Sequence, residues 1–269
     1  METEKKKMRL VMSKVITPGL LLLILLPLII VQTACSQTRE WVPEDTEFYE
    51  PVPPVIESSP VFQEAPSDAI VLFNGAGFSA WQSVRGGDVD WDLNDGTMTV
   101  KPGTGNIVTK ENFGSIQLYL EWKSPEVIDG DGQGRGNSGV FLQRRYEVQV
   151  LDMFENETYT NGMAASIYKQ HVPFANVASP RGEWNTYNII FEAPEFRENG
   201  SIEKPAYVTV FWNGVLVQHK AEVQGSTEYI GPPSYTMHGE DGIELQDHSD
   251  RVSFRNIWLR KLDESPVRQ

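Results

Sequence analysis

The stretch VFWNGVLV, residues 210–217, is the most informative part of the chain about its fold. Two apolar runs flank the dipeptide Asn213-Gly214. A two-residue Asn-Gly loop between apolar runs is typical of a β-hairpin, because both residues tolerate the positive φ angles that the tight turn requires. The sequence therefore predicts two antiparallel strands joined at this dipeptide.

The same composition recurs along the chain in short segments that are rich in β-branched and aromatic residues and bounded by turn formers. These segments are 69–73, 97–101, 116–123, 139–143, 146–151, 187–193, 207–212, 215–220 and 252–262. No stretch longer than about ten residues has the 3.6-residue periodicity of an amphipathic helix. Many short strands without helical crossovers predict an all-β, antiparallel β-sandwich or jelly roll, which we place at residues 67–263 as one domain.

The charge balance argues against one class of partner. The chain has 269 residues, with 23 Lys and Arg against 37 Asp and Glu, and its formal net charge is −14. Nucleic-acid binding requires clustered basic side chains that neutralise phosphates, and the basic residues here are scattered. We therefore predict no nucleic-acid partner and an acidic surface.

The N-terminus has the features of an export signal. A basic cluster, KKKMR at 5–9, precedes an apolar run from Leu20 to Val31 that is too short for a spanning helix. The run leads into VQTAC, which resembles a bacterial lipoprotein signal with Cys35 as the lipidated residue, although Gln32 departs from the usual aliphatic residue. The prediction is a signal peptide at 1–34 and an exported protein, anchored in a membrane only through lipid, in the outer membrane or facing the periplasm. A plain signal peptide that leaves a free thiol is the alternative.

Residues 35–66 have little periodicity and many prolines among acidic residues. This composition predicts an extended, poorly ordered tether between the anchor and the domain. Residues 264–269 are expected to form a short tail.

Six motifs give the domain a specific resemblance. They are LFNGAGFSAW (72–81), GNSGVFL (136–142), YEVQVLD (146–152), GEWNTYNIIF (182–191), VTVFWNGVLVQ (208–218) and GIELQDHSDRVSFRNIWLRKL (242–262). In this order they resemble the 3-keto-disaccharide hydrolase family. The resemblance implies a jelly roll like those of concanavalin and laminin G, and cleavage of the glycosidic bond of 3-keto sugars.

The strand YEVQVLD contains the candidate catalytic groups. Period-2 alternation places Glu147 and Gln149 on one face of the strand. A bulge near Val150–Leu151 would bring Asp152 to the same face, and bulges often lie beside active sites. This arrangement resembles that of jelly-roll glycosidases, where two carboxylates act as nucleophile and acid. Here the middle residue is an amide and the last is the shorter aspartate, so a different reaction is expected.

A ketone at C3 of a sugar acidifies the proton on C2, so that a base can remove it and the anomeric group can leave. We predict Glu147 as this base, Asp152 as a second acid/base or a substrate ligand, and Gln149 as a neutral donor. Direct hydrolysis is left open beside elimination followed by hydration. The alternative is that all three residues make only structural hydrogen bonds.

Further candidate substrate-binding residues lie at turns and strand ends: Arg144, Lys169, His171, Gln246, Asp247 and His248. Arginine suits recognition of a carboxylate or sugar hydroxyls, and Lys169 could polarise the ketone. His171 could titrate near neutral pH. For each of them a surface loop or a stabilised turn is the alternative.

No cofactor is predicted. The segment DGDGQGRG, residues 129–136, has the acidic, glycine-rich composition of a calcium loop but lacks the EF-hand positions, so a calcium ion is left open. We expect this segment to be a mobile loop at the rim of the site. Two other functions compete with the enzyme: a non-catalytic carbohydrate-binding module and a lectin-like scaffold. The sequence does not predict the oligomeric state.

Overall fold

The computed structural model describes residues 40–50, 52, 64–127 and 129–262. The expected signal peptide (1–34), Cys35 and the tail (264–269) lie outside these residues. Within them, no helix is long and apolar enough to cross a membrane.

The described residues form strands joined by turns, with three short 3₁₀ helices. The strands are β1 (Ile70–Phe73), β2 (Trp81–Ser83), β3 (Asp92–Asn94), β4 (Thr97–Thr99), β5 (Ile107–Thr109), β6 (Ile116–Lys123), β7 (Ser138–Leu142), β8 (Tyr146–Val150), β9 (Asn185–Glu192), β10 (Glu195–Phe196), β11 (Ile202–Lys204), β12 (Tyr207–Trp212), β13 (Val215–Glu222), β14 (Glu244–Leu245) and β15 (Ser253–Lys261). The 3₁₀ helices are η1 (Pro43–Thr46), η2 (Gly132–Gly134) and η3 (Thr160–Gly162).

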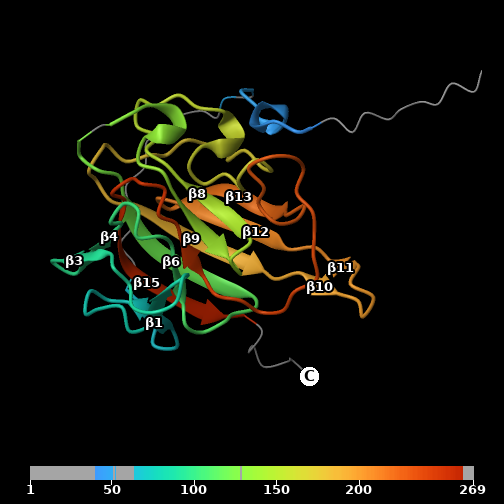
Figure 1. The fold of residues 1–269 in the computed structure, drawn as a ribbon, viewed down its shortest axis with the longest axis horizontal. Coiled ribbons are helices and arrows are strands. Elements are labelled where there is room, and N and C mark those ends of the chain that lie inside the picture. Colours follow the sequence, from blue (N-terminus) through green and yellow to red (C-terminus); the bar gives the residue numbers. More distant parts are fainter. Residues whose placement is uncertain (1–39, 51, 53–63, 128, 263–269) are drawn as a thin grey trace, which may run out of the picture. The chain divides into compact units, whose positions relative to one another are not determined.

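The larger sheet has the strand order β13-β12-β9-β6-β15-β4-β3, and β1 pairs with β15 at the side. Figure 1 shows its long strands running side by side from β13 to β15. The expected hairpin is confirmed, because β12 and β13 are antiparallel and the turn residues Asn213 and Gly214 have φ angles of 50° and 78°. Glycine tolerates this left-handed conformation without cost, and asparagine adopts it more readily than most residues do.

The smaller sheet has the order β2-β5-β14-β7-β8. Its inward residues, such as Val140 and Val148, share one hydrophobic core with Leu118 and Ile189 of the larger sheet. The Tyr187 hydroxyl of β9 crosses between the sheets and donates a hydrogen bond of 2.8 Å to the carbonyl of β8 residue 149. The protein is therefore the antiparallel β-sandwich that the sequence predicts.

All nine predicted strands are present, with ends that differ by a few residues. The sequence did not predict β2, β3, β5, β10, β11 and β14. Each has only two or three residues, which is too short for alternation to be visible.

The expectation of an extended tether is wrong for residues 41–50. The side chain of Asn161 uses its oxygen to accept from the amide of Phe48 and its nitrogen to donate to the carbonyl of Thr46. Asn161 is fully buried, and the Trp41 ring packs on Gly231. The aromatic residues and free backbone groups of this segment find partners on the domain, which proline-rich composition alone does not indicate. We call residues 41–50 the N-terminal strap.

Candidate active site

The outer face of the smaller sheet is polar. Because Tyr146, Val148 and Val150 lie in the core, the alternation of β8 directs Glu147 and Gln149 to the opposite face. On β7, the partner of Gln149 is Gly139. The strand register therefore places the two predicted polar residues of β8 beside a position that has no side chain.

A further segment, residues 165–168, lies along the free edge of β8, and an isolated antiparallel bridge between Ile167 and Val148 joins the two. The amide of Tyr168 donates to the carbonyl of Glu147 at 3.1 Å, and the amide of Gln149 donates to the carbonyl of Ser166 at 3.0 Å. This register makes Tyr168 the cross-strand neighbour of Glu147, and Ser166 that of Gln149. Side chains in such positions start about 5 Å apart.

Glu147 is a buried acid without a counter-ion. The residue is 4% exposed, and burial raises the pKa of its carboxyl from 4.5 to about 8. Within the described part of the chain, no group donates a hydrogen bond to the carboxylate. A Cβ atom at Gly139 would collide with its Oε1 atom and with the Phe141 ring, so glycine leaves the space that the carboxylate occupies. A carboxylate with a raised pKa is a stronger base than an ordinary one.

Gln149 is held in place on both sides of its amide. Its Nε2 atom donates to Oε1 of Gln133 at 3.1 Å, and its Oε1 atom accepts from the amide of Val150 at 3.1 Å. Two neighbouring polar atoms, Oγ of Ser166 and Oε1 of Gln246, are buried and have no partner in the described part of the chain. Buried polar atoms are nearly always hydrogen-bonded, so these two are candidates for contacts with a ligand.

Gln246, one of the predicted substrate-binding residues, also lies on this face. Its amide donates to the carbonyl of Gly139 at 3.1 Å, which extends the pairing of β14 with β7 by one residue. Gln246 and Gln149 therefore lie on either side of Gly139 in one row across the sheet.

Asp152 emerges where the expected irregularity lies, but its carboxylate is already occupied. Val150 and Leu151 both belong to the core, so the alternation shifts by one residue between them. The Asp152 carboxylate lies 2.9 Å from Nε of Arg135 and 3.5 Å from Nε of Arg181. Neither N–H is aligned for a hydrogen bond, so both contacts are ion pairs. This arrangement disfavours Asp152 as a second catalytic acid and favours a structural role.

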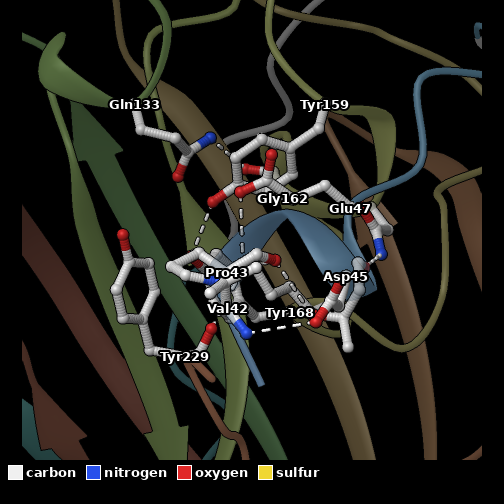
Figure 2. Close-up of polar contacts among 12 residues, drawn as sticks. Val42, Pro43, Asp45, Glu47, Gln133, Tyr159, Gly162, Tyr168 and Tyr229 are labelled. Atoms are coloured by element: carbon white, nitrogen blue, oxygen red, sulfur yellow. Dashed lines mark hydrogen bonds and ion pairs between the residues drawn. The ribbon is translucent and has the colours of Figure 1, made fainter. Parts of the chain in front are cut away.

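Lys169 is not free to polarise a ketone. Its ammonium donates to the carbonyls of Pro43 and Tyr229 at 3.0 Å each and lies 3.5 Å from the carboxylate of Glu47. Figure 2 shows the strap residues Pro43 and Glu47 beside Tyr159, Tyr168 and Tyr229. The lysine side chain is only 3% exposed. It therefore anchors the N-terminal strap at the edge of the site.

The remaining predicted residues make other contacts or are exposed. Arg144 forms an ion pair of 3.0 Å with Glu244. The ring of His171 is hydrogen-bonded at 2.7 Å to a carbonyl of β13. Asp247 accepts at 2.8 Å from a backbone amide in the loop after β4 and stabilises its own turn, and His248 is exposed.

The segment 129–136 is a rim of the site. Gln133 of η2 contacts Gln149 and also donates to the carbonyl of Gly162 at 2.8 Å, and Arg135 holds Asp152. These contacts join the segment to the residues of the site that it borders. No group of three or more His, Cys, Asp or Glu residues in the described ranges is arranged to hold a metal ion.

Sequence reasoning missed Gly139, Ser166, Tyr168 and Gln133 as site residues. The segment SIY, residues 166–168, has the alternation of a short strand, and this pattern is the one signal that could have indicated Tyr168. Its pairing with β8 is a long-range contact that no local pattern encodes.

Comparison with known proteins identifies the family. The model of the 3-keto-α-glucoside-1,2-lyase-like domain matches residues 68–260. The chain belongs to this family. The chain is also similar to the 3-keto-disaccharide hydrolase of Bacteroides thetaiotaomicron, with 25% identity over 248 residues, which are 74% of this chain and 81% of that protein.

Two crystal structures from Parabacteroides distasonis ATCC 8503, both of candidate glycosyl hydrolases, resemble this lyase-like domain. The first is 50% identical, covers 81% of this chain and 96% of its own, and has a TM-score of 0.73. The second is 24% identical, covers 72% and 94%, and has a TM-score of 0.53, so it supports the fold alone. The names in this family support a glycoside-hydrolase-like function.

Proposed function

We propose that the protein cleaves the glycosidic bond of 3-keto-glycosides, with Glu147 as the base that removes the proton from C2. The observation that carries the proposal is the buried carboxylate of Glu147, which has no partner in the described residues and a pKa raised by burial to about 8. The family name and the name of the Bacteroides relative support the substrate class.

The chemistry follows from the ketone. The carbonyl at C3 stabilises the enolate that forms when the C2 proton moves to the Glu147 carboxylate. The electron pair of the enolate then forms a double bond between C2 and C1. At the same time the bond between C1 and the glycosidic oxygen breaks, and the aglycone departs. Addition of water to the resulting double bond gives the free 3-keto sugar, so the net change is hydrolysis.

Two features favour this route over a retaining glycosidase mechanism, which needs a nucleophile and an acid about 5–5.5 Å apart. Asp152, the second carboxylate of the strand, is tied to two arginines. Glu244, across β7, is bonded to Asn106 at 2.6 Å and to Arg144. One unpaired base suffices for proton abstraction beside a ketone.

The test compares two substrates that differ only at C3. The protein is incubated with a 3-keto-glucoside and with the matched glucoside that carries a hydroxyl at C3, and aglycone release is followed. We expect release from the keto substrate alone. Equal release from both, or release from neither, would contradict the proposal.

A further inference from the structure

We propose that Tyr168 is a second catalytic residue, which donates its phenolic proton to the glycosidic oxygen as the aglycone leaves. This inference rests on the proposed function, since it assigns the acid that complements Glu147. Its basis is the position of Tyr168 and the balance of hydrogen-bond donors and acceptors around its hydroxyl.

The position comes from the sheet register. Tyr168 is the cross-strand neighbour of Glu147, through the backbone bond of 3.1 Å between them. The tyrosine is 8% exposed and Glu147 4%, so both are largely shielded from solvent. Base and acid therefore start from adjacent points on the same face.

The proton balance comes from a pair of tyrosines. The hydroxyl oxygens of Tyr159 and Tyr168 are 2.6 Å apart, so one hydroxyl donates to the other. Two hydroxyls carry two protons, and this hydrogen bond uses one of them. Neither hydroxyl has another acceptor within the described residues. One phenolic proton is therefore available for an oxygen of a bound ligand.

The two hydroxyls are not equivalent. Burial raises the pKa of both, but their mutual hydrogen bond raises the pKa of Tyr159 further and lowers that of Tyr168. Either hydroxyl can donate within the pair. When Tyr159 donates, Tyr168 keeps the available proton, and Tyr168 is the tyrosine of the pair that lies beside Glu147. The ring of Tyr159 is itself fixed, because it packs against Gly162 where a Cβ atom would collide with it (Figure 2).

Electrostatics couples the acid to the base. The pKa of Tyr168 is raised to about 12, mainly by burial and in part by the charge of Glu147. When the Glu147 carboxylate takes the C2 proton, its charge disappears and Tyr168 becomes a stronger acid. The proton therefore becomes available at the stage when the glycosidic oxygen develops negative charge.

Glu147 gains the C2 proton, the C2 electron pair forms the double bond to C1, and the leaving oxygen takes the Tyr168 proton. In the hydration step, the Tyr168 phenolate accepts a proton from the attacking water, and Glu147 returns its proton to C2. Both side chains end in their starting states.

Leaving-group chemistry provides the test. Tyr168→Phe removes the proton and keeps the ring, so release of a sugar or alkyl aglycone from a 3-keto-glucoside should fall by about 10²–10³ in kcat/KM. A nitrophenyl aglycone departs without a proton, so its release should fall by less than about threefold. Tyr207→Phe on β12, whose hydroxyl lies near Glu222, is the matched control and should change neither.

A second readout separates this inference from the proposed function. Tyr168→Phe should still release the deuteron from a C2-deuterated substrate, because Glu147 is intact. Equal losses with both aglycones, or loss of deuteron release, would overturn the role of Tyr168 while wild-type activity upholds the proposed function. If the wild-type protein releases no C2 deuteron, both fall together.

Discussion

Replacement of Glu147 by glutamine should stabilise the protein, and the gain should grow with pH. The folded-state pKa of the carboxyl is about 8, against an ordinary value of 4.5, because burial disfavours its charged form. The unfolded chain releases this proton near pH 4.5 and the folded chain releases it near pH 8. The free energy of unfolding of the wild type is therefore highest below about pH 4.5 and falls as the pH rises toward 8. Glutamine keeps the shape and removes the titration.

The magnitude follows from the two pKa values. Each pKa unit is worth about 1.4 kcal/mol, so the rise from 4.5 to about 8 corresponds to about 5 kcal/mol of unfolding free energy at pH 8 and above. For a domain of this size, that difference corresponds to about 10–20 °C in Tm.

The assay is thermal unfolding of the wild type and Glu147→Gln from pH 4.5 to 8.5. The two Tm values should nearly coincide at the acid end and diverge steadily above it. Glu195→Gln, on β10 with a side chain that is 65% exposed, controls for the general effect of removing a charge. A difference between wild type and Glu147→Gln that does not change with pH would refute the burial argument.

Three further changes test other parts of the site. Gly139→Ala should displace the Glu147 carboxylate and lower the rate of aglycone release by about 10²-fold. Gly239→Ala is the control and should have no effect in the same assay, because a Cβ atom at this position has nothing within 4 Å. Asp152→Asn should lower the unfolding free energy in denaturant titrations by about 3–5 kcal/mol, because it leaves a buried arginine unpaired; wild-type stability would contradict this. Removal of residues 1–63 should lower the Tm, because the buried Lys169 loses two acceptors that are worth about 2–4 kcal/mol. Removal of residues 1–40 should leave the Tm unchanged. Equal Tm values for the two truncated proteins would show that the strap contributes nothing to stability.

The sequence indicated the parts of the site that depend on local patterns. Alternation along β8 placed Glu147 and Gln149 on one face, and two adjacent apolar residues marked the shift in alternation before Asp152. Local patterns could not indicate what these side chains contact. The two arginines that form ion pairs with Asp152, Arg135 and Arg181, come from other loops of the chain.

The same limit applies to the edge of the site. Tyr168 lies opposite Glu147 only because residues 165–168 pair with β8 in one particular register. Proline and acidic residues are typical of extended segments, so the composition of the N-terminal strap predicts a tether. Its attachment depends on Asn161 and Lys169, and neither residue has a sequence signature that indicates such a partner.

The central claim is that the Glu147 carboxylate removes the C2 proton, and the rate of deuteron release from a C2-deuterated 3-keto methyl glucoside tests it most directly. This rate counts proton removal whether or not the aglycone then leaves. For the wild type, kcat/KM for release should rise with pH around an apparent pKa of about 8, as the carboxyl ionises. Glu147→Gln should reduce it by about 10²–10⁴ at pH 8 and above, where the wild-type carboxyl is ionised, and should remove the rise with pH. Release by Glu147→Gln at the wild-type rate, or a wild-type rate that is flat from about pH 6 to 9, would contradict the account.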